Sequence, residues 1–175
     1  MSTFISGGCK NGKSFYAQRI AKDSGQPLYY IATMIPHDEE DDARILRHRD
    51  ERDGWGFETL ECGTDILSCL DHADPNGSFL LDSVTALLSN EMFAPDGFHP
   101  EAADKIASEL CEFVRRAPKT VLVSDFTYSD AALYDEWTEA YRCGLARIDR
   151  ALACVCDHVL EVVNGQIICY KGALP

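Results

Sequence analysis

The 175-residue sequence lacks a surplus of basic side chains. Its 16 lysines and arginines stand against 29 aspartates and glutamates, which gives a formal net charge of −13. Because proteins that bind nucleic acid neutralise its phosphates with a basic surface, this balance argues against nucleic acid as a partner. No apolar run reaches the length of a membrane span, and the first residues lack a basic stretch followed by a signal-type apolar segment. We therefore expect no membrane span and a cytoplasmic location.

Cysteine spacing typical of metal sites is also missing. The eight cysteines stand at positions 9, 62, 69, 111, 143, 154, 156 and 169, with no C-x-x-C pair and no Cys/His cluster at zinc spacing. Several lie in apolar segments, where cysteine acts as a small hydrophobic residue. We expect reduced and mostly buried thiols, with Cys9 as an exposed exception.

One motif dominates the start of the chain. It fits G-x-x-x-x-G-K-[ST], the phosphate-binding loop (P-loop), and consists of Gly7, Gly8, Cys9, Lys10, Asn11, Gly12, Lys13 and Ser14. An apolar pair precedes the motif and a helix-compatible stretch follows it, which is the context that the motif needs. Backbone amides and the helix N-terminus of such a loop bind phosphate oxygens. We expect all eight residues to contact a nucleotide, with Lys13 on the β- and γ-phosphates and Ser14 on Mg²⁺.

Strand-like and helix-like segments alternate along the rest of the chain. Apolar runs typical of strands occupy residues 3–6, 28–32, 57–60, 79–82, 120–124 and 159–163, and Asn164-Gly165 predicts a hairpin to 166–170. Helical periodicity occupies residues 13–23, 39–52, 64–71, 84–93, 100–115 and 132–156. The alternation predicts a single α/β domain over residues 1–175. We expect a P-loop NTPase-like three-layer sandwich with a mostly parallel central sheet and an antiparallel C-terminal hairpin.

Asp82 is the second candidate metal ligand. It ends the apolar run 79–82, and ligands of parallel sheets bind at the carboxyl ends of strands. We expect Asp82 to hold Mg²⁺ directly or through water. The alternative is that Asp82 caps the helix that begins just after it.

Arg44, His48 and Arg52 form a second cluster. They are spaced four residues apart, so a helix places them along one face. The two guanidinium groups can bind phosphate oxygens and lower the pKa of the imidazole, which keeps it neutral and nucleophilic. A neutral histidine can attack the α-phosphorus of a nucleotide. The alternative is a solvated helix face with ordinary ion pairs.

Together these motifs resemble one family. The chain reads Y-I-A-T at 30–33, A-R-I-L-R-H-R at 43–49 and L-L-D-S-V-T at 80–85. Members of the adenosylcobinamide kinase/adenosylcobinamide-phosphate guanylyltransferase family carry G-G-x-R-S-G-K-S, Y-I-A-T, R-I-x-x-H-[KR]-x-x-R and L-[LV]-[DE]-C-[LI]-T in the same order. The likeness is specific from residue 4 to about residue 95 and looser through the closing hairpin.

The resemblance implies a two-stage transferase of cobalamin biosynthesis. A nucleoside triphosphate, ATP or GTP, phosphorylates the hydroxyl of a cobinamide. GTP then transfers GMP to a histidine, which falls on His48, and the GMP moves on to the cobinamide phosphate. The resemblance also implies Mg²⁺ and a homotrimer.

The chain departs from the family in three places, one of which is Asp53, where the family usually has a proline after the last arginine of the histidine motif. Cys9-Lys10-Asn11 replaces the family's A-R-S in the P-loop. After the strand at 120–124 the family carries N-E-V-G, and its glutamate falls on Phe126. Asp125 and Asp130 are the candidates to replace that carboxylate.

Two other functions stay open at the level of sequence. One is a P-loop kinase for another small molecule, in which His48 only binds phosphate. The other is a GTP-binding protein without turnover. A switch GTPase is disfavoured because the N-K-x-D motif that reads guanine does not occur.

Overall fold

The computed structural model describes residues 1–36, 43, 45–46, 49 and 52–174. The strands of its main sheet are β1 (Thr3–Gly7), β2 (Leu28–Ala32), β3 (Glu58–Glu61), β4 (Ser78–Asp82), β7 (Thr120–Val123), β8 (His158–Val163) and β9 (Gln166–Lys171). They lie in the order β3-β2-β4-β7-β1-β8-β9. Neighbouring strands are parallel except for β9, which is antiparallel to β8. The structure thus confirms the predicted fold class.

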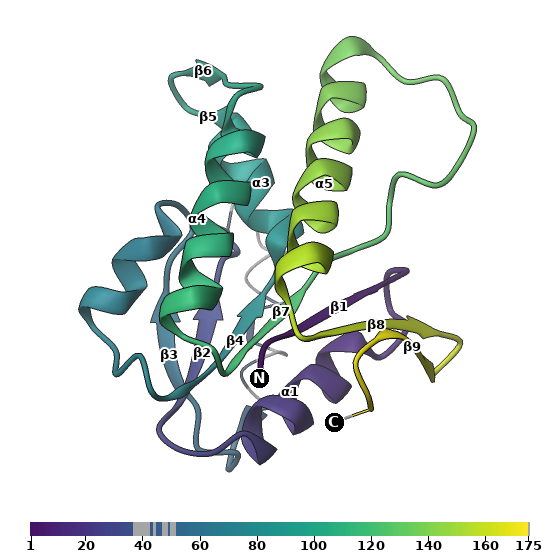
Figure 1. Ribbon diagram of the computed structural model, residues 1–175. Helices are drawn as coiled ribbons and strands as arrows, with labels where there is room; N and C mark the ends of the chain where they lie inside the picture. Colours follow the sequence, from purple (N-terminus) through teal and green to yellow (C-terminus); the bar gives the residue numbers. More distant parts are fainter. Residues whose placement is uncertain (37–42, 44, 47–48, 50–51, 175) are drawn as a thin grey trace.

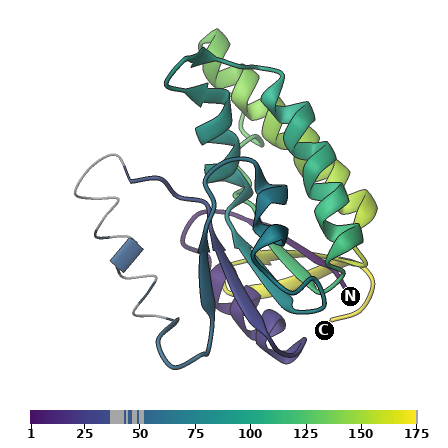
Figure 2. The same cartoon turned by 90° about the vertical axis from the view of Figure 1, so that its left-hand side faces the viewer.

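Helices cover both faces of this sheet (Figure 1). The helices are α1 (Lys13–Asp23), α3 (Val84–Met92), α4 (Ala102–Arg116) and α5 (Glu136–Val155), with the 3₁₀ helix η1 (Ile66–Asp71). Helix α1 lies on one face, and α3, α4, α5 and η1 lie on the other; Figure 2 shows the two layers from the side. Strand β1 leads into α1 and β4 leads into α3. Because β1 and β4 are both parallel to β7, these two helices start at the same end of the sheet.

The central strands are buried on both faces because their side chains alternate between two cores. In β4, Phe79 and Leu81 pack in the core under α3, α4 and α5, whereas Leu80 packs in the core with α1. Leu122 of β7 joins the first core, and its neighbours on either side join the second. This arrangement explains why these strands read as continuous apolar runs.

Several element boundaries differ from the sequence prediction. The helix expected at 132–156 begins only at Glu136, because the Asp135 carboxylate accepts hydrogen bonds from the backbone N–H groups of Trp137 and Thr138 and caps it there. The segment expected at 64–71 is a six-residue 3₁₀ helix that starts after Asp65, whose φ is +49°. Of the helix expected at 39–52, residues 43, 45, 46, 49 and 52 are described, and they are helical.

Two further features were not expected. A small hairpin of β5 (Phe93–Ala94) and β6 (Gly97–Phe98) projects beyond α3. The eight cysteines are free, as predicted, but only Cys62, Cys69 and Cys156 are buried, so the prediction of mostly buried thiols is wrong. In the described part of the chain no helix is long and apolar enough to cross a membrane.

Candidate nucleotide-binding active site

The P-loop connects β1 to α1. Gly7 has a φ of +152°, and a Cβ there would collide with the carbonyl oxygen of Val162 in β8. Gly12 has a φ of +86° and stands directly before α1, whose first turn carries no acidic residue. No carboxylate of the helix's own first turn therefore competes for these N-terminal amide groups, which favours binding of an anion.

Lys13 is the buried cation of the loop, with 6% of its surface exposed. Its Nζ donates a hydrogen bond to the carbonyl oxygen of Gly8 at 2.8 Å and pairs with Oδ1 of Asp125, also at 2.8 Å. Asp125 follows the carboxyl end of β7, which is the immediate neighbour of β1 in the sheet. The lysine is thus held over the loop by a carboxylate from the adjacent strand end.

Ser14, the residue after Lys13 in α1, contacts Asp82 at the end of β4. The Ser14 hydroxyl donates to Oδ2 of Asp82 at 3.0 Å. Ser83 caps α3, since its hydroxyl accepts from the N–H of Ala86 at 3.3 Å. The alternative that Asp82 is the cap is therefore wrong, and its carboxylate faces the P-loop.

The oxygen atoms of Ser14 and Asp82 fit the preference of Mg²⁺ for hard ligands. Within the described residues there is no group of three or more His, Cys, Asp or Glu side chains that could hold a metal ion. Magnesium usually binds one or two protein ligands and completes its shell with phosphates and water. A pair of protein oxygens beside a phosphate loop meets that requirement.

A buried polar network joins three strand ends next to this site. The Thr33 hydroxyl donates to the carbonyl oxygen of Ser83 at 2.8 Å and accepts from the Ser83 N–H at 2.7 Å. The Asn90 amide donates to the carbonyl oxygens of Thr33 and Gly63 at 2.7 and 2.9 Å. These bonds fix the ends of β2 and β4 relative to the loop after β3.

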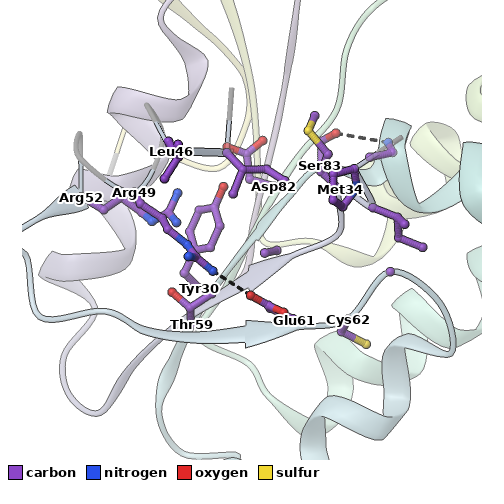
Figure 3. A pocket seen from close by; sticks show the side chains of 16 residues that line it. Tyr30, Met34, Leu46, Arg49, Arg52, Thr59, Glu61, Cys62, Asp82 and Ser83 are labelled. Atoms are coloured by element: carbon purple, nitrogen blue, oxygen red, sulfur yellow. Dashed lines mark hydrogen bonds and ion pairs between the residues drawn. The ribbon is translucent and has the colours of Figure 1, made fainter. Parts of the chain in front are cut away.

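A pocket of about 680 Å³ is lined by Asp82, among other residues (Figure 3). It is connected to the P-loop through the hydrogen bond between Asp82 and Ser14. Tyr30, Met34, Leu46 and Cys62 give it an apolar lining. Its volume falls in the range of small-molecule sites, which measure about 300–1,000 Å³. The pocket is therefore large enough for a nucleoside.

Two arginines bring positive charge to this pocket. Arg52 is 7% exposed, its guanidinium stacks 3.4 Å from the ring centre of Tyr30, and its Nη1 has no hydrogen-bond partner among the described residues. Arg49 pairs with Glu61 at 2.7 Å, and both side chains are largely exposed. Because exposed pairs contribute little free energy, Arg49 can leave Glu61 for a phosphate at small cost.

Comparison with known proteins agrees with this geometry. Residues 3–169 match the model of the family described as cobinamide kinase / cobinamide phosphate guanyltransferase. The chain belongs to this family. It is thus a transferase, and its relatives with curated descriptions match it along nearly their whole length.

Two of those relatives illustrate the likeness. The bifunctional adenosylcobalamin biosynthesis protein CobU of Salmonella typhimurium is 33% identical over 94% of this chain and 97% of its own length. The protein CobP of Pseudomonas aeruginosa, described in the same words, is 30% identical over 98% of each chain.

Solved structures share the fold at low identity. The RadB recombinase covers 99% of this chain and 81% of its own, with a TM-score of 0.52 and 16% identity. A Pyrococcus horikoshii protein matches with a TM-score of 0.56, 9% identity and 87% of its own chain covered. These matches support the P-loop NTPase fold alone.

The structure places the remaining predicted residues of the family site as follows. Arg44 and His48 lie outside the described residues, whereas Arg52 lines the pocket. In the P-loop, Asn11 donates from its amide to the carbonyl oxygen of Val162 at 3.3 Å, so it ties the loop to β8. Gly8 is half-buried, and Cys9 and Lys10 are exposed.

Of the two candidates for the family's missing glutamate, only one lies at the P-loop. Asp125 pairs with Lys13, whereas Asp130 binds Arg142 of α5 at 3.3 Å and accepts from the N–H of Ala132. Phe126 is 40% exposed, and its ring packs edge-on against Tyr128 with ring centres 4.8 Å apart. A carboxylate is therefore present at this strand end, one residue before the expected position.

Sequence reasoning missed a second carboxylate behind Asp125. Asp149 of α5 is 3% exposed, and its Oδ2 accepts a hydrogen bond from the Tyr128 hydroxyl at 2.9 Å. Burial raises the pKa of Asp149 to about 7, and the negative charge of Asp125 adds to that rise. Only the contact of α5 with the segment after β7 reveals this residue, because nothing in its local sequence marks it.

Replacing Asp149 by asparagine should change how stability depends on pH. An unfolded aspartate ionises near pH 3.9, whereas folded Asp149 keeps its proton up to about pH 7. Between these values the folded state binds more protons, so the wild type loses stability as pH rises. From pH 5 to pH 8 the free energy of unfolding of Asp149→Asn, relative to wild type, should increase by about 2–3 kcal/mol.

Urea denaturation at the two pH values measures this difference. Asp71→Asn is the matched control because Asp71 is an exposed aspartate at the end of η1. The difference in the free energy of unfolding between Asp71→Asn and wild type should be the same at pH 5 and at pH 8. Equal differences at pH 5 and pH 8 for Asp149→Asn would contradict the prediction.

Proposed function

We propose that this chain is a bifunctional enzyme that phosphorylates a cobinamide and then transfers GMP to the cobinamide phosphate through His48. The observation that carries the proposal is that Asp82 lines the arginine-lined pocket and also accepts a hydrogen bond from Ser14 of the P-loop. Arg49 and Arg52, which line the pocket, belong to the same segment as His48. A nucleotide bound by the P-loop can thus lie close to the segment that carries the nucleophile.

In the kinase stage, the P-loop holds the triphosphate of ATP or GTP. Backbone amides at the start of α1 and the Lys13 ammonium contact the β- and γ-phosphates. Ser14 and Asp82 hold Mg²⁺, which neutralises phosphate charge when it is bound. The hydroxyl oxygen of the cobinamide bonds to the γ-phosphorus and gives up its proton. The bond from that phosphorus to the bridging oxygen breaks, and the nucleoside diphosphate leaves with the electron pair.

In the guanylyltransferase stage, the neutral imidazole of His48 attacks the α-phosphorus of GTP. A P–N bond forms, the bond from the α-phosphorus to the bridging oxygen breaks, and pyrophosphate leaves with the electron pair. A phosphate oxygen of the cobinamide phosphate then attacks the same phosphorus and releases the histidine. Arg52 can bind the phosphate oxygens, which is supported by its buried guanidinium nitrogen without a partner among the described residues.

The family resemblance also supports a homotrimer in the cytoplasm. Neighbouring subunits of such a trimer can help to form the site for the large cobinamide. Light scattering tests this part of the proposal, since a mass other than three chains would exclude it.

The direct test of the function is an adduct assay. Incubation with GTP labelled at the α-phosphorus and Mg²⁺ should label the protein with an acid-labile, base-stable adduct. Addition of adenosylcobinamide phosphate should then remove the label from the protein. Transfer of γ-phosphate without any adduct would instead indicate a small-molecule kinase, and GTP binding without either reaction would indicate a binding protein.

A further inference from the structure

The segment after β7 is held rigidly over the P-loop. The N–H of Ser124 donates to the carbonyl oxygen of Ile5, and the N–H of Phe126 donates to that of Gly7, both at 3.0 Å. Between them, the N–H of Asp125 donates to the Thr85 hydroxyl of α3 at 2.9 Å. The backbone of Asp125 is therefore fixed to β1 on one side and to α3 on the other, and Figure 1 shows this segment leaving the same sheet edge as the P-loop.

The side chain of Asp125 contacts Lys13 through one carboxylate oxygen and can accept further hydrogen bonds. Its Oδ1 pairs with Lys13, whereas its Oδ2 accepts no hydrogen bond from the described residues. The side chain is 23% exposed, so Asp125 is only partly covered by the protein. An ionised carboxylate has about four lone-pair positions, and most of those on Asp125 are available to a substrate hydroxyl.

Binding of a triphosphate changes the charge balance around this carboxylate. Phosphate oxygens compete with Asp125 for the Lys13 ammonium, which is the group that P-loop enzymes direct at the β- and γ-phosphates. Asp82 is engaged by Ser14 on the side where the metal is expected. Among the described residues, Asp125 is then the carboxylate at Lys13 that is not engaged by Ser14 at the expected metal position.

We propose that Asp125 is the proton acceptor of the kinase reaction. The inference rests on the proposed function. As the hydroxyl oxygen of the acceptor bonds to the γ-phosphorus, its proton passes to the Asp125 carboxylate. The bond between the γ-phosphorus and the bridging oxygen breaks, and the nucleoside diphosphate leaves with that electron pair. Phe126 cannot take this role, because its side chain has no basic atom and packs against Tyr128.

The test compares Asp125→Asn with wild type by three measured quantities: the kcat and nucleotide KM of γ-phosphate transfer, and labelling by α-labelled GTP. With γ-labelled ATP or GTP and adenosylcobinamide, the kcat of Asp125→Asn should fall by about 10²–10⁴-fold, the usual contribution of a general base. The KM for the nucleotide should stay equal or decrease, because Lys13 loses a competing partner. Labelling by α-labelled GTP should continue, since the guanylyl step does not use Asp125.

Two further variants distinguish the loss of a proton acceptor at position 125 from a general structural effect of the substitution. Asp130→Asn is the matched control and should keep the wild-type kcat, because Asp130 binds Arg142 rather than Lys13. Asp125→Glu keeps a carboxylate and should retain at least ten times the kcat of Asp125→Asn.

The outcomes distinguish this inference from the proposed function. Kinase activity in the wild type supports the proposed function whatever Asp125 does. A kcat of Asp125→Asn within threefold of wild type would overturn the inference alone, as would equal loss in Asp125→Asn and Asp125→Glu. A wild type that forms the adduct but transfers no γ-phosphate would overturn it as well.

Discussion

Replacement of Lys13 by methionine should lower the kcat of nucleoside-triphosphate turnover by at least about 10³-fold. Removal of one hydrogen-bond donor to the transition-state charge typically lowers kcat by about 10²–10³-fold, and Lys13 also carries a full positive charge. Its ammonium is buried at the P-loop and held 2.8 Å from Asp125. Methionine keeps the length and the apolar stem of lysine while removing the charge. Loss of γ-phosphate transfer to the acceptor, measured with labelled ATP or GTP, checks this result.

Lys10→Met provides a matched control within the same loop. Lys10 has a φ of +59°, is exposed and has no ion pair or hydrogen bond of its side chain among the described residues. Its replacement should change kcat by less than about tenfold, since an exposed charge is screened by solvent. Activity of Lys13→Met within tenfold of wild type would refute the assigned role of Lys13. Urea denaturation of both variants checks that they are folded.

Replacement of His48 by asparagine should abolish the covalent GMP adduct. Asparagine has no nucleophilic ring nitrogen, so labelling with α-labelled GTP should fall to background, at least about 10³-fold below wild type. The kinase step uses the P-loop and Asp125 and should continue. A gel assay of the labelled protein and an assay of γ-phosphate transfer on the same samples measure the two steps separately.

His72→Asn is the control for this experiment. His72 is exposed at the end of η1 and does not line the pocket. Its replacement should leave labelling unchanged. An adduct that persists in His48→Asn would exclude His48 as the nucleophile, whereas loss of both steps in His48→Asn would indicate that the residue is needed for nucleotide binding rather than for attack.

The roles of the Y-I-A-T segment and of Asn90 could not be worked out from the sequence. The motif places Thr33 at the end of a strand but does not reveal its contacts. In the structure Thr33 is fully buried and bonds to Ser83 fifty residues away, and Asn90 bonds to Thr33 and Gly63. These residues serve to align strand ends, so their part in the site is indirect.

Likewise, only the fold shows which of the two candidate carboxylates lies at the P-loop. Asp125 and Asp130 are equally polar and only five residues apart, so the sequence gives no reason to prefer one. The backbone bonds of Ser124 and Phe126 to β1 direct Asp125 toward Lys13, while Arg142 of α5 binds Asp130. In the same way Asp82 and Ser83 are adjacent candidates for the helix cap, and backbone geometry assigns the cap to Ser83.

By itself the sequence determined the phosphate loop, the alternation of strands and helices, and the family. Those signals lie in contiguous residues, where glycine, lysine and apolar periodicity act through local backbone geometry. Only the tertiary structure decided which distant side chains meet: Lys13 with Asp125, Ser14 with Asp82, and Arg52 with Tyr30 beside one pocket. The first two contacts depend on how parallel strands are ordered in the sheet, because strand order brings together residues that are 112 and 68 positions apart in the chain.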